Sequence, residues 1–180
     1  MNFVKDKLYH RRSLHNQYGG NPQGGISNCR NHPIIFIFTG NSGEQYGYED
    51  GWDKDGYFRY TGAGQIGDMK FENRLGNRPL LEHKENNKRV FLFEKTNQSG
   101  YWKFIDELKL EGFDYFISKD REGDDRNSIK FRFISISRSD ITVEEGYSSA
   151  EEFKNSKPNR TERKGLVTSR VGQGNYRQNL

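Results

Sequence analysis

Short apolar runs separated by polar, glycine-rich segments recur along the chain and predict a protein built mainly from strands. Residues 33–39 and 89–94 are the strongest runs, and both are rich in the β-branched and aromatic residues typical of buried strands. Residues 101–105 follow the second run after the turn sequence Asn-Gln-Ser-Gly, so we expect them to form its hairpin partner. Residues 107–117 are expected to continue the sheet. Residues 129–136 alternate apolar and charged side chains, which is typical of a half-exposed strand.

The segments between these runs predict few helices and several loops. We expect a first helix within residues 1–15 and one short helix within residues 73–86. Residues 16–31 are polar and rich in Gly and Asn, residues 120–127 are mostly charged, and both are expected to be loops. Residues 46–60 are expected to form a hairpin-like excursion. Many short strands, glycine turns and few helices predict an α+β fold, mainly β, with the sheet curled into a barrel or sandwich.

The composition indicates a folded domain in spite of its low hydrophobicity. Only 31% of the residues are apolar and the mean hydropathy is -1.07, but 13 Phe, 10 Tyr and 2 Trp supply rings that each bury a large area. The single cysteine, Cys29, excludes an internal disulfide and a zinc site built on several cysteines, and it fits a reducing cytoplasm. No apolar run is long enough to span a membrane, and the N-terminus lacks a signal-peptide core. We therefore expect a cytoplasmic protein with no membrane partner.

The charge distribution separates the chain into two parts. Residues 151–180 hold 7 Lys/Arg and 3 Asp/Glu, whereas residues 1–150 hold 22 of each sign. We therefore expect one domain over residues 1–150 and a basic linker over residues 151–180. Because the domain carries no net charge, a nucleic acid would have to bind a local patch. The candidates for phosphate contacts, which could equally form a solvated helix face, are Lys5, Lys7, Arg11 and Arg12.

The sequence offers little that is typical of catalysis. Asp68 with Glu82 and Lys84 matches the loosest form of a PD-(D/E)xK nuclease site, in which carboxylates hold Mg²⁺ and a lysine lies near the attacking water. Such matches are common by chance in a chain with 30% charged residues, so a metal-dependent nuclease is kept as the alternative. The four histidines lack the spacing of a zinc site. Residues 62–67 fit G-x-G-x-x-G but have no parallel-strand and helix context, which excludes a dinucleotide site.

Tyr48 and Tyr60 lie twelve residues apart, each near a glycine turn, and their rings could enclose a flat ligand such as a nucleobase. A base turned out of a duplex loses its stacking and pairing, and aromatic rings restore the stacking by roughly 1–3 kcal/mol per base. Asp50 and Asp53 could accept hydrogen bonds from a cytosine amino group, and Thr61 offers a hydroxyl and a methyl group. The alternative interpretation is that both tyrosines are ordinary residues of the barrel.

The segment around these tyrosines matches a known signature. Residues 47–64, Gly-Tyr-Glu-Asp-Gly-Trp-Asp-Lys-Asp-Gly-Tyr-Phe-Arg-Tyr-Thr-Gly-Ala-Gly, closely resemble the central signature of SRA (SET and RING-associated) domains. The resemblance implies an SRA-like, PUA-related curved β-barrel that binds methylated DNA. It also implies that 5-methylcytosine is flipped into a pocket between two tyrosines, which fall on Tyr48 and Tyr60.

Two further positions refine this expectation. The carboxylate with which SRA domains hold the cytosine edge falls on Gly51 in this chain, so Asp50 or Asp53 would have to replace it. Gly-Gly-Ile before the first apolar run resembles the loop with which SRA domains approach DNA. The DNA-binding residues expected there are Gly24, Gly25, Ile26 and Ser27.

A second resemblance extends over almost the whole chain. Residues 18–27, 36–40, 67–69 and 91–94 resemble the SRA-like N-terminal region of bacterial McrA-type HNH endonucleases. Residues 168–180 are similar to the segment that leads into their nuclease domain. It implies the specificity module of a modification-dependent, type IV restriction endonuclease, whose partner is double-stranded DNA carrying a modified base. The catalytic HNH residues would lie in a further domain or subunit together with their divalent metal, so we expect no cofactor and no catalysis for this chain. A PUA-like barrel that binds RNA or a small ligand is the third interpretation.

Overall fold

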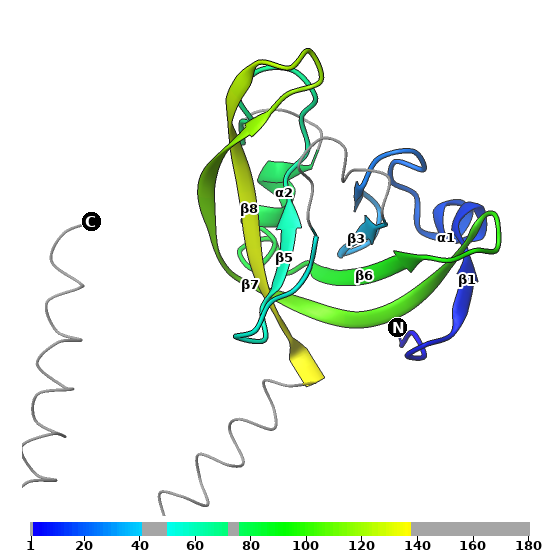
Figure 1. Cartoon of the computed structure of the whole chain (residues 1–180). Helices are drawn as coiled ribbons and strands as arrows, with labels where there is room; N and C mark the ends of the chain where they lie inside the picture. Colours follow the sequence, from blue (N-terminus) through cyan, green and yellow to red (C-terminus); the bar gives the residue numbers. More distant parts are fainter. Residues whose placement is uncertain (1, 41–49, 72–75, 138–180) are drawn as a thin grey trace, which may run out of the picture. The chain divides into compact units, whose positions relative to one another are not determined.

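The computed structural model describes residues 2–40, 50–71 and 76–137, all within one compact unit, Met1–Ser139. The strands of this part of the chain form one eight-stranded sheet (Figure 1). Two short helices accompany it among the described residues, α1 (Arg11–Tyr18) and α2 (Asn77–Leu81). The strands are β1 (Leu8–His10), β2 (Ile26–Cys29), β3 (Ile34–Thr39), β4 (Gly51–Trp52), β5 (Phe58–Thr61), β6 (Arg89–Lys95), β7 (Tyr101–Lys119) and β8 (Asp125–Ser135).

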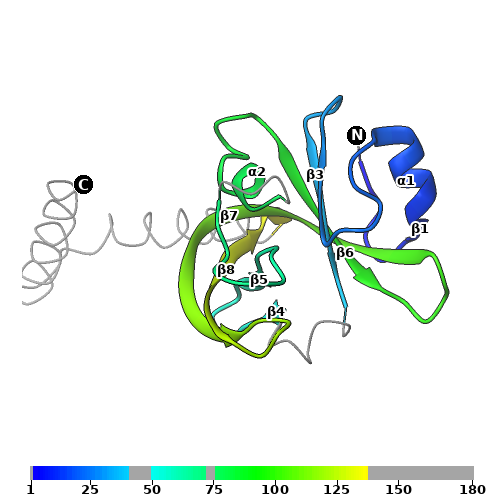
Figure 2. The same ribbon diagram turned by 90° about the horizontal axis from the view of Figure 1, so that it is seen from above.

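β7 organises the sheet because two groups of strands share it. The strand order is β2-β3-β6-β7-β8-β5-β4, and β1 pairs with β7 outside this path. The first part of β7 pairs with β6 and its longer second part with β8. Register shifts between Leu92 and Phe93 and between Leu110 and Gly112 interrupt these pairings, and such irregularities bend strands and increase their twist. β7 and β8 accordingly curve together through the sheet (Figure 2).

Alternate residues of β3 belong to two hydrophobic cores, one on each face of the sheet. Ile35 belongs to the core that also holds Leu80 of α2. Phe36 belongs to the second core, which holds Leu14 of α1. β3 pairs in parallel with β6, whose residues divide between the same two cores. Both strands are therefore buried on both faces, which is why their sequences read as continuous apolar runs.

The structure confirms the mainly β fold and most of the predicted elements. All five predicted strands agree with β3, β6, β7 or β8, and residues 101–105 and 107–117 belong to one strand of 19 residues, β7. The short helix expected within residues 73–86 is α2. In the described part of the expected hairpin, β4 and β5 pair around a turn closed by Asp53 and Gly56. No helix among the described residues combines the length and apolar character needed to cross a membrane.

The N-terminal segment differs from its prediction. β1 precedes α1, so residues 1–15 are not a single helix, and β2 occupies part of the predicted loop 16–31. β1 pairs with residues 101–103 at the start of β7, and β2 pairs with β3. Both segments are strands because pairing with a neighbouring strand satisfies their backbone groups, and this pairing overrides local propensity.

The predicted solvated loop 120–127 is also more ordered than expected. β8 already begins at Asp125, and the side chains of Asp120 and Arg126 are buried. The carboxylate of Asp120 accepts a hydrogen bond from the backbone N–H of Gly67 over 2.9 Å. The turn between β7 and β8 is therefore tied to the glycine-rich segment that follows β5.

Candidate functional site

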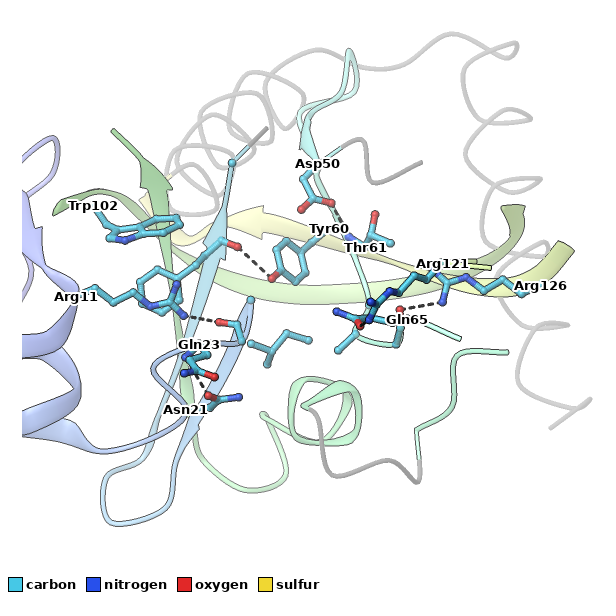
Figure 3. Close-up of a pocket in the computed structure, with 18 residues that line it drawn as sticks. Arg11, Asn21, Gln23, Asp50, Tyr60, Thr61, Gln65, Trp102, Arg121 and Arg126 are labelled. Carbon is cyan, nitrogen blue, oxygen red and sulfur yellow. Dashed lines mark hydrogen bonds between the residues drawn. The ribbon is translucent and has the colours of Figure 1, made fainter. Parts of the chain in front are cut away.

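A pocket of about 770 Å³ opens beside β3 and β5, and its volume is in the range of small-ligand sites (Figure 3). Its walls come from the start of α1, the loop into β2, the ends of β3 and β5, the glycine-rich segment after β5, and β7 and β8. The lining residues are Arg11, Asn21, Gln23, Gly24, Gly25, Ile26, Phe38, Gly40, Asp50, Tyr60, Thr61, Gly62, Ala63, Gly64, Gln65, Trp102, Arg121 and Arg126.

Tyr60 forms a fixed wall of this pocket. Its side chain is 3% exposed, its ring stacks on Phe58 with centroids 6.5 Å apart, and its hydroxyl donates to the carbonyl oxygen of Phe38 over 3.3 Å. Gly25 packs closely against this hydroxyl, because a Cβ atom at Gly25 would lie only 2.7 Å from Tyr60 Oη. The stacking on Phe58 and the two contacts of the hydroxyl therefore hold the ring in one position before any ligand binds.

Two other members of the predicted base pocket are not placed in it. Tyr48 lies outside the described residues, so the enclosure of a base by two rings stays a prediction. Asp53 lies in the turn between β4 and β5, outside the pocket lining, so the geometry does not support the prediction that it reads a base edge. Its carboxylate accepts a hydrogen bond from Arg59 Nε over 2.6 Å and from the backbone N–H of Tyr57 over 2.9 Å. The hydrogen bond from Arg59, and then the one from Tyr57, lowers the pKa of Asp53. Because both bonds lie within the β4–β5 hairpin, this carboxylate stabilises the turn.

Asp50 and Thr61 line the pocket and bind each other. Asp50 Oδ1 accepts the backbone N–H of Thr61 over 2.7 Å, and Oδ2 accepts the hydroxyl of Thr39 over 3.4 Å. Burial raises the pKa of Asp50 above its ordinary value, against the opposing hydrogen bonds from Thr61. Thr61 Oγ1 in turn accepts a hydrogen bond from Lys130 Nζ over 2.8 Å. Because each carboxylate oxygen has two acceptor sites, Asp50 can still hold a donor such as an amino group.

Arg11, expected to reach a phosphate from the surface, is folded into the pocket wall. Its guanidinium carbon lies 3.8 Å from the ring centroid of Phe38 and 5.1 Å from that of Trp102. Nη2 donates to the carbonyl oxygen of Gly24, and Nε donates to Nε2 of His15 over 3.5 Å. Burial lowers the pKa of Arg11, although a guanidinium stays charged in proteins. Arg11 is therefore a positioned cation of the pocket.

The remaining predicted DNA contacts divide into pocket residues and surface residues. Gly24, Gly25 and Ile26 line the pocket. Ser27 is fully buried in β2 and lies outside the pocket lining, so its contact with DNA stays a prediction that the geometry does not support. The exposed cations outside the pocket lining, whose phosphate contacts stay a prediction, are Lys5, Lys7 and Arg12.

Two arginines not singled out in the sequence line the pocket across Tyr60 from Arg11 (Figure 3). Arg126 is 3% exposed, and its Nη1 donates to the carbonyl oxygen of Gly64 over 2.8 Å. Arg121 donates through its backbone N–H to the carbonyl oxygen of residue 65 over 2.8 Å. The glycine-rich segment and the charged turn are each visible in the sequence, but no local pattern indicates that they meet.

The pocket is positively charged within a domain that is electrically balanced. Its charged lining residues are Arg11, Arg121, Arg126 and Asp50, whereas residues 1–150 hold equal numbers of both signs. A local cationic patch of this kind is what a balanced domain needs in order to attract a polyanion.

The residues of the alternative nuclease site lie outside the pocket lining and make separate contacts. Asp68 accepts a backbone N–H of β8 over 2.7 Å, and Glu82 pairs with an arginine one helical turn earlier at 2.8 Å. Lys84 Nζ lies 3.9 Å from Glu111 of β7. Among the described residues, no three His, Cys, Asp or Glu side chains gather as a metal site requires. The geometry therefore does not support the PD-(D/E)xK interpretation.

Comparison with known proteins points to one family. The sequence pattern of the family described as ScoMcrA-like, SRA domain, matches residues 4–147. The sulfur binding domain and SRA domain of ScoMcrA, complexed with phosphorothioated DNA, is similar with a TM-score of 0.59 and 18% identity over 75% of this chain and 40% of that chain. The type IV phosphorothioation-dependent restriction endonuclease ScoMcrA is similar with a TM-score of 0.59 and 21% identity over 75% of this chain and 28% of that chain.

A third structure extends the likeness to an isolated SRA domain. The SUVH5 SRA domain in complex with hemi-methylated CG DNA is similar with a TM-score of 0.51 and 19% identity over 74% of this chain and 88% of that chain. At such identities the likeness concerns the fold. The chain spans less than half the length of the two ScoMcrA chains. No curated protein sequence matches it.

Proposed function

This chain belongs to the family of ScoMcrA-like SRA domains, and from that premise we propose that it binds double-stranded DNA carrying a modified base. The proposal rests on one observation, a cationic pocket of about 770 Å³ in which a fixed tyrosine, Tyr60, lies beside a half-buried carboxylate, Asp50. The ligand is a base of the 5-methylcytosine type turned out of the duplex. Relatives of the same fold have been seen with phosphorothioated or hemi-methylated DNA, which supports DNA as the partner.

The pocket offers groups that replace what a flipped base loses. Tyr60 contributes a ring on one side and Tyr48 would contribute the other, and stacking of this kind stabilises a bound base by roughly 1–3 kcal/mol. Asp50 accepts hydrogen bonds, which suits the exocyclic amino group of a cytosine. Thr61 brings a hydroxyl and a methyl group to the same wall. Gly25 lets the backbone approach the ligand where a side chain would collide with Tyr60.

The biological context that we propose is modification-dependent restriction. Residues 1–150 would form the recognition domain and residues 151–180 a basic linker. An HNH nuclease domain or subunit, with its own divalent metal, would then cut the DNA that this module selects, in the cytoplasm. One relative is described as a type IV phosphorothioation-dependent restriction endonuclease, which supports this setting.

A binding titration with matched duplexes tests the proposal. One duplex sequence carries cytosine, 5-methylcytosine or 5-hydroxymethylcytosine at a central position and is titrated with the full chain by fluorescence anisotropy. We expect one modified duplex to bind at least about tenfold more tightly than the unmodified one, a difference of about 1.4 kcal/mol. Tyr48→Ala should abolish most of this preference, because it removes one of the two stacking surfaces.

The matched control is Tyr115→Ala, because Tyr115 is 59% exposed and lies outside the pocket lining. Its affinity for each duplex should equal that of the unaltered chain. Equal affinity for all three duplexes, unchanged by Tyr48→Ala, would contradict base flipping. Mg²⁺-dependent cleavage by the purified chain would favour the nuclease alternative, and a preference for RNA would favour the PUA-like one.

A further inference from the structure

At one end of the pocket, two side chains carry hydrogen-bond donors that no described acceptor uses. Arg11 uses Nε and Nη2 for His15 and Gly24, while its Nη1 donates to no described residue. The indole Nε1 of Trp102, which also lines the pocket, makes no hydrogen bond within the described ranges. Arginine and tryptophan side chains carry donors only. A ligand group that binds to these two donors must therefore be an acceptor.

The same end is cationic. Lys95 is the cross-strand partner of Trp102, and directly opposed residues project from the same face of a sheet. The stem of Lys95 lies against Gly40, since a Cβ atom at Gly40 would be 2.7 Å from Lys95 Cβ, and Gly40 lines the pocket. Neither Arg11 nor Lys95 has an ion pair with any residue that the structure describes.

The aromatic surroundings of Arg11 favour an anion over a neutral acceptor. Its guanidinium lies against the rings of Phe38 and Trp102, which themselves meet edge to face with centroids 5.0 Å apart. A cation that is partly desolvated by such rings keeps its charge, and charge-assisted hydrogen bonds are about twice as strong as neutral ones. The anionic acceptor that every DNA strand carries is the phosphodiester group.

We propose that Arg11, Trp102 and Lys95 form a seat for one phosphodiester group of the DNA strand whose base enters the pocket. Arg11 Nη1 and Trp102 Nε1 donate to its non-bridging oxygens, and Lys95 adds positive charge. The inference rests on the proposed function, because the phosphate belongs to the same strand as the flipped base. In Figure 3, Arg11 and Trp102 lie together on one side of Tyr60, so this phosphate is one that flanks the flipped nucleotide.

Methylphosphonate substitution tests this seat, because it replaces an anionic oxygen by a neutral methyl group. The parent is the modified duplex that the full chain binds best, and single methylphosphonates are placed in turn at the phosphates around the modified base. We expect one position to weaken binding by about tenfold. Arg11→Gln should weaken binding of the parent by a similar factor and should be insensitive to methylphosphonate at that position. Trp102→Phe keeps an aromatic ring but removes the Nε1 donor, so it should weaken binding by a smaller factor.

Lys109→Gln is the matched control for charge, because its side chain is 50% exposed and lies outside the pocket lining. It should retain full sensitivity to the critical methylphosphonate. If Arg11→Gln does not fold in a thermal melt, Lys95→Gln takes its place in the same comparison, since Lys95 is exposed.

Two results separate the failure of this inference from that of the proposed function. If the unaltered chain shows no preference for any modified duplex, the proposed function is wrong. The other result is that the unaltered chain shows that preference while Arg11→Gln and each methylphosphonate weaken binding independently, so that their fold-losses multiply at every position. In that case the proposed function stands and the phosphate seat is wrong.

Discussion

Gly25 shows how one residue without a side chain shapes the pocket. Its Cα lies so close to Tyr60 that an added Cβ atom would be 2.7 Å from the tyrosine hydroxyl. That hydroxyl is itself bound to the carbonyl oxygen of Phe38. The loop into β2, the end of β3 and the wall tyrosine therefore meet at a single point, where no additional atom fits.

Gly25→Ala should destabilise the fold by about 1–3 kcal/mol, the usual cost of overpacking a filled site. In the Tyr60→Phe background the cost should be smaller, because the oxygen atom that collides with the new methyl group is gone. Urea unfolding of the four proteins in this double-mutant cycle measures the coupling. Gly51→Ala is the control, since nothing lies within 4 Å of a Cβ atom there. Strictly additive effects of the two substitutions would contradict the predicted contact.

At the scale of elements, the two short helices hold pocket segments in place. α1 has 8 residues and α2 has 5. α1 begins with Arg11, whose guanidinium binds the carbonyl oxygen of Gly24. α2 begins with the fully buried Asn77, whose side chain bonds both backbone groups of Ala63, at 2.6 Å and 2.7 Å. Each helix thus positions a glycine-rich loop, which has little regular structure of its own to hold it.

Acid should weaken the packing around both helices. Burial lowers the pKa of His15 in α1 and of His83 just after α2 below the ordinary value of 6.5. Below about pH 6.5 the unfolded chain therefore binds protons that the folded chain resists, so the free energy of unfolding decreases as the pH falls through that range. Urea unfolding at about pH 7.5 and about pH 5.5 measures this loss. The pair of substitutions His15→Asn and His83→Asn should reduce the loss, and an undiminished pH dependence would argue against this origin.

For the whole molecule, the important feature is a local positive pocket in a domain with balanced charge. Arg11, Arg121 and Arg126 gather at the pocket, whereas residues 1–150 hold 22 charges of each sign. Association with DNA should consequently depend on a few phosphate contacts and on the fit of the base. This differs from proteins that attract DNA through a large excess of positive charge.

The salt dependence of binding should therefore be shallow. If only the three or four cations at the pocket contact phosphates, the slope of log K against log salt concentration should be roughly −3 to −4, and contacts by Lys5, Lys7 and Arg12 would make it steeper. Arg121→Gln should reduce the size of the slope by about 1 while leaving the preference for modified over unmodified duplex unchanged. Anisotropy titrations over a series of NaCl concentrations measure both quantities. A slope near roughly −10 would instead indicate binding through an extended basic surface.

The sequence by itself determined the strands β3, β6, β7 and β8 and pointed to several residues that line the pocket. β3 and β6 are buried on both faces, so they appear as unbroken apolar runs, and β8 alternates because one of its faces is less buried. Tyr60, Asp50 and Thr61 were recognisable because they lie in one short segment that matches the SRA signature. Such features are local, and local patterns survive in a one-dimensional sequence.

Only the tertiary structure decided which charged groups meet at the pocket. It placed Asp53 in the turn between β4 and β5 and packed Arg11 against Phe38 and Trp102. It also brought Arg121 and Arg126 to the glycine-rich segment after β5. These contacts depend on the pairing of β5 with β8 and of β6 with β7, and on the turn that Asp120 ties down. The partners of Arg11, Arg121 and Arg126 are dozens of residues away along the chain, so these side chains converge only when the sheet has formed, and no spacing along the chain records that convergence.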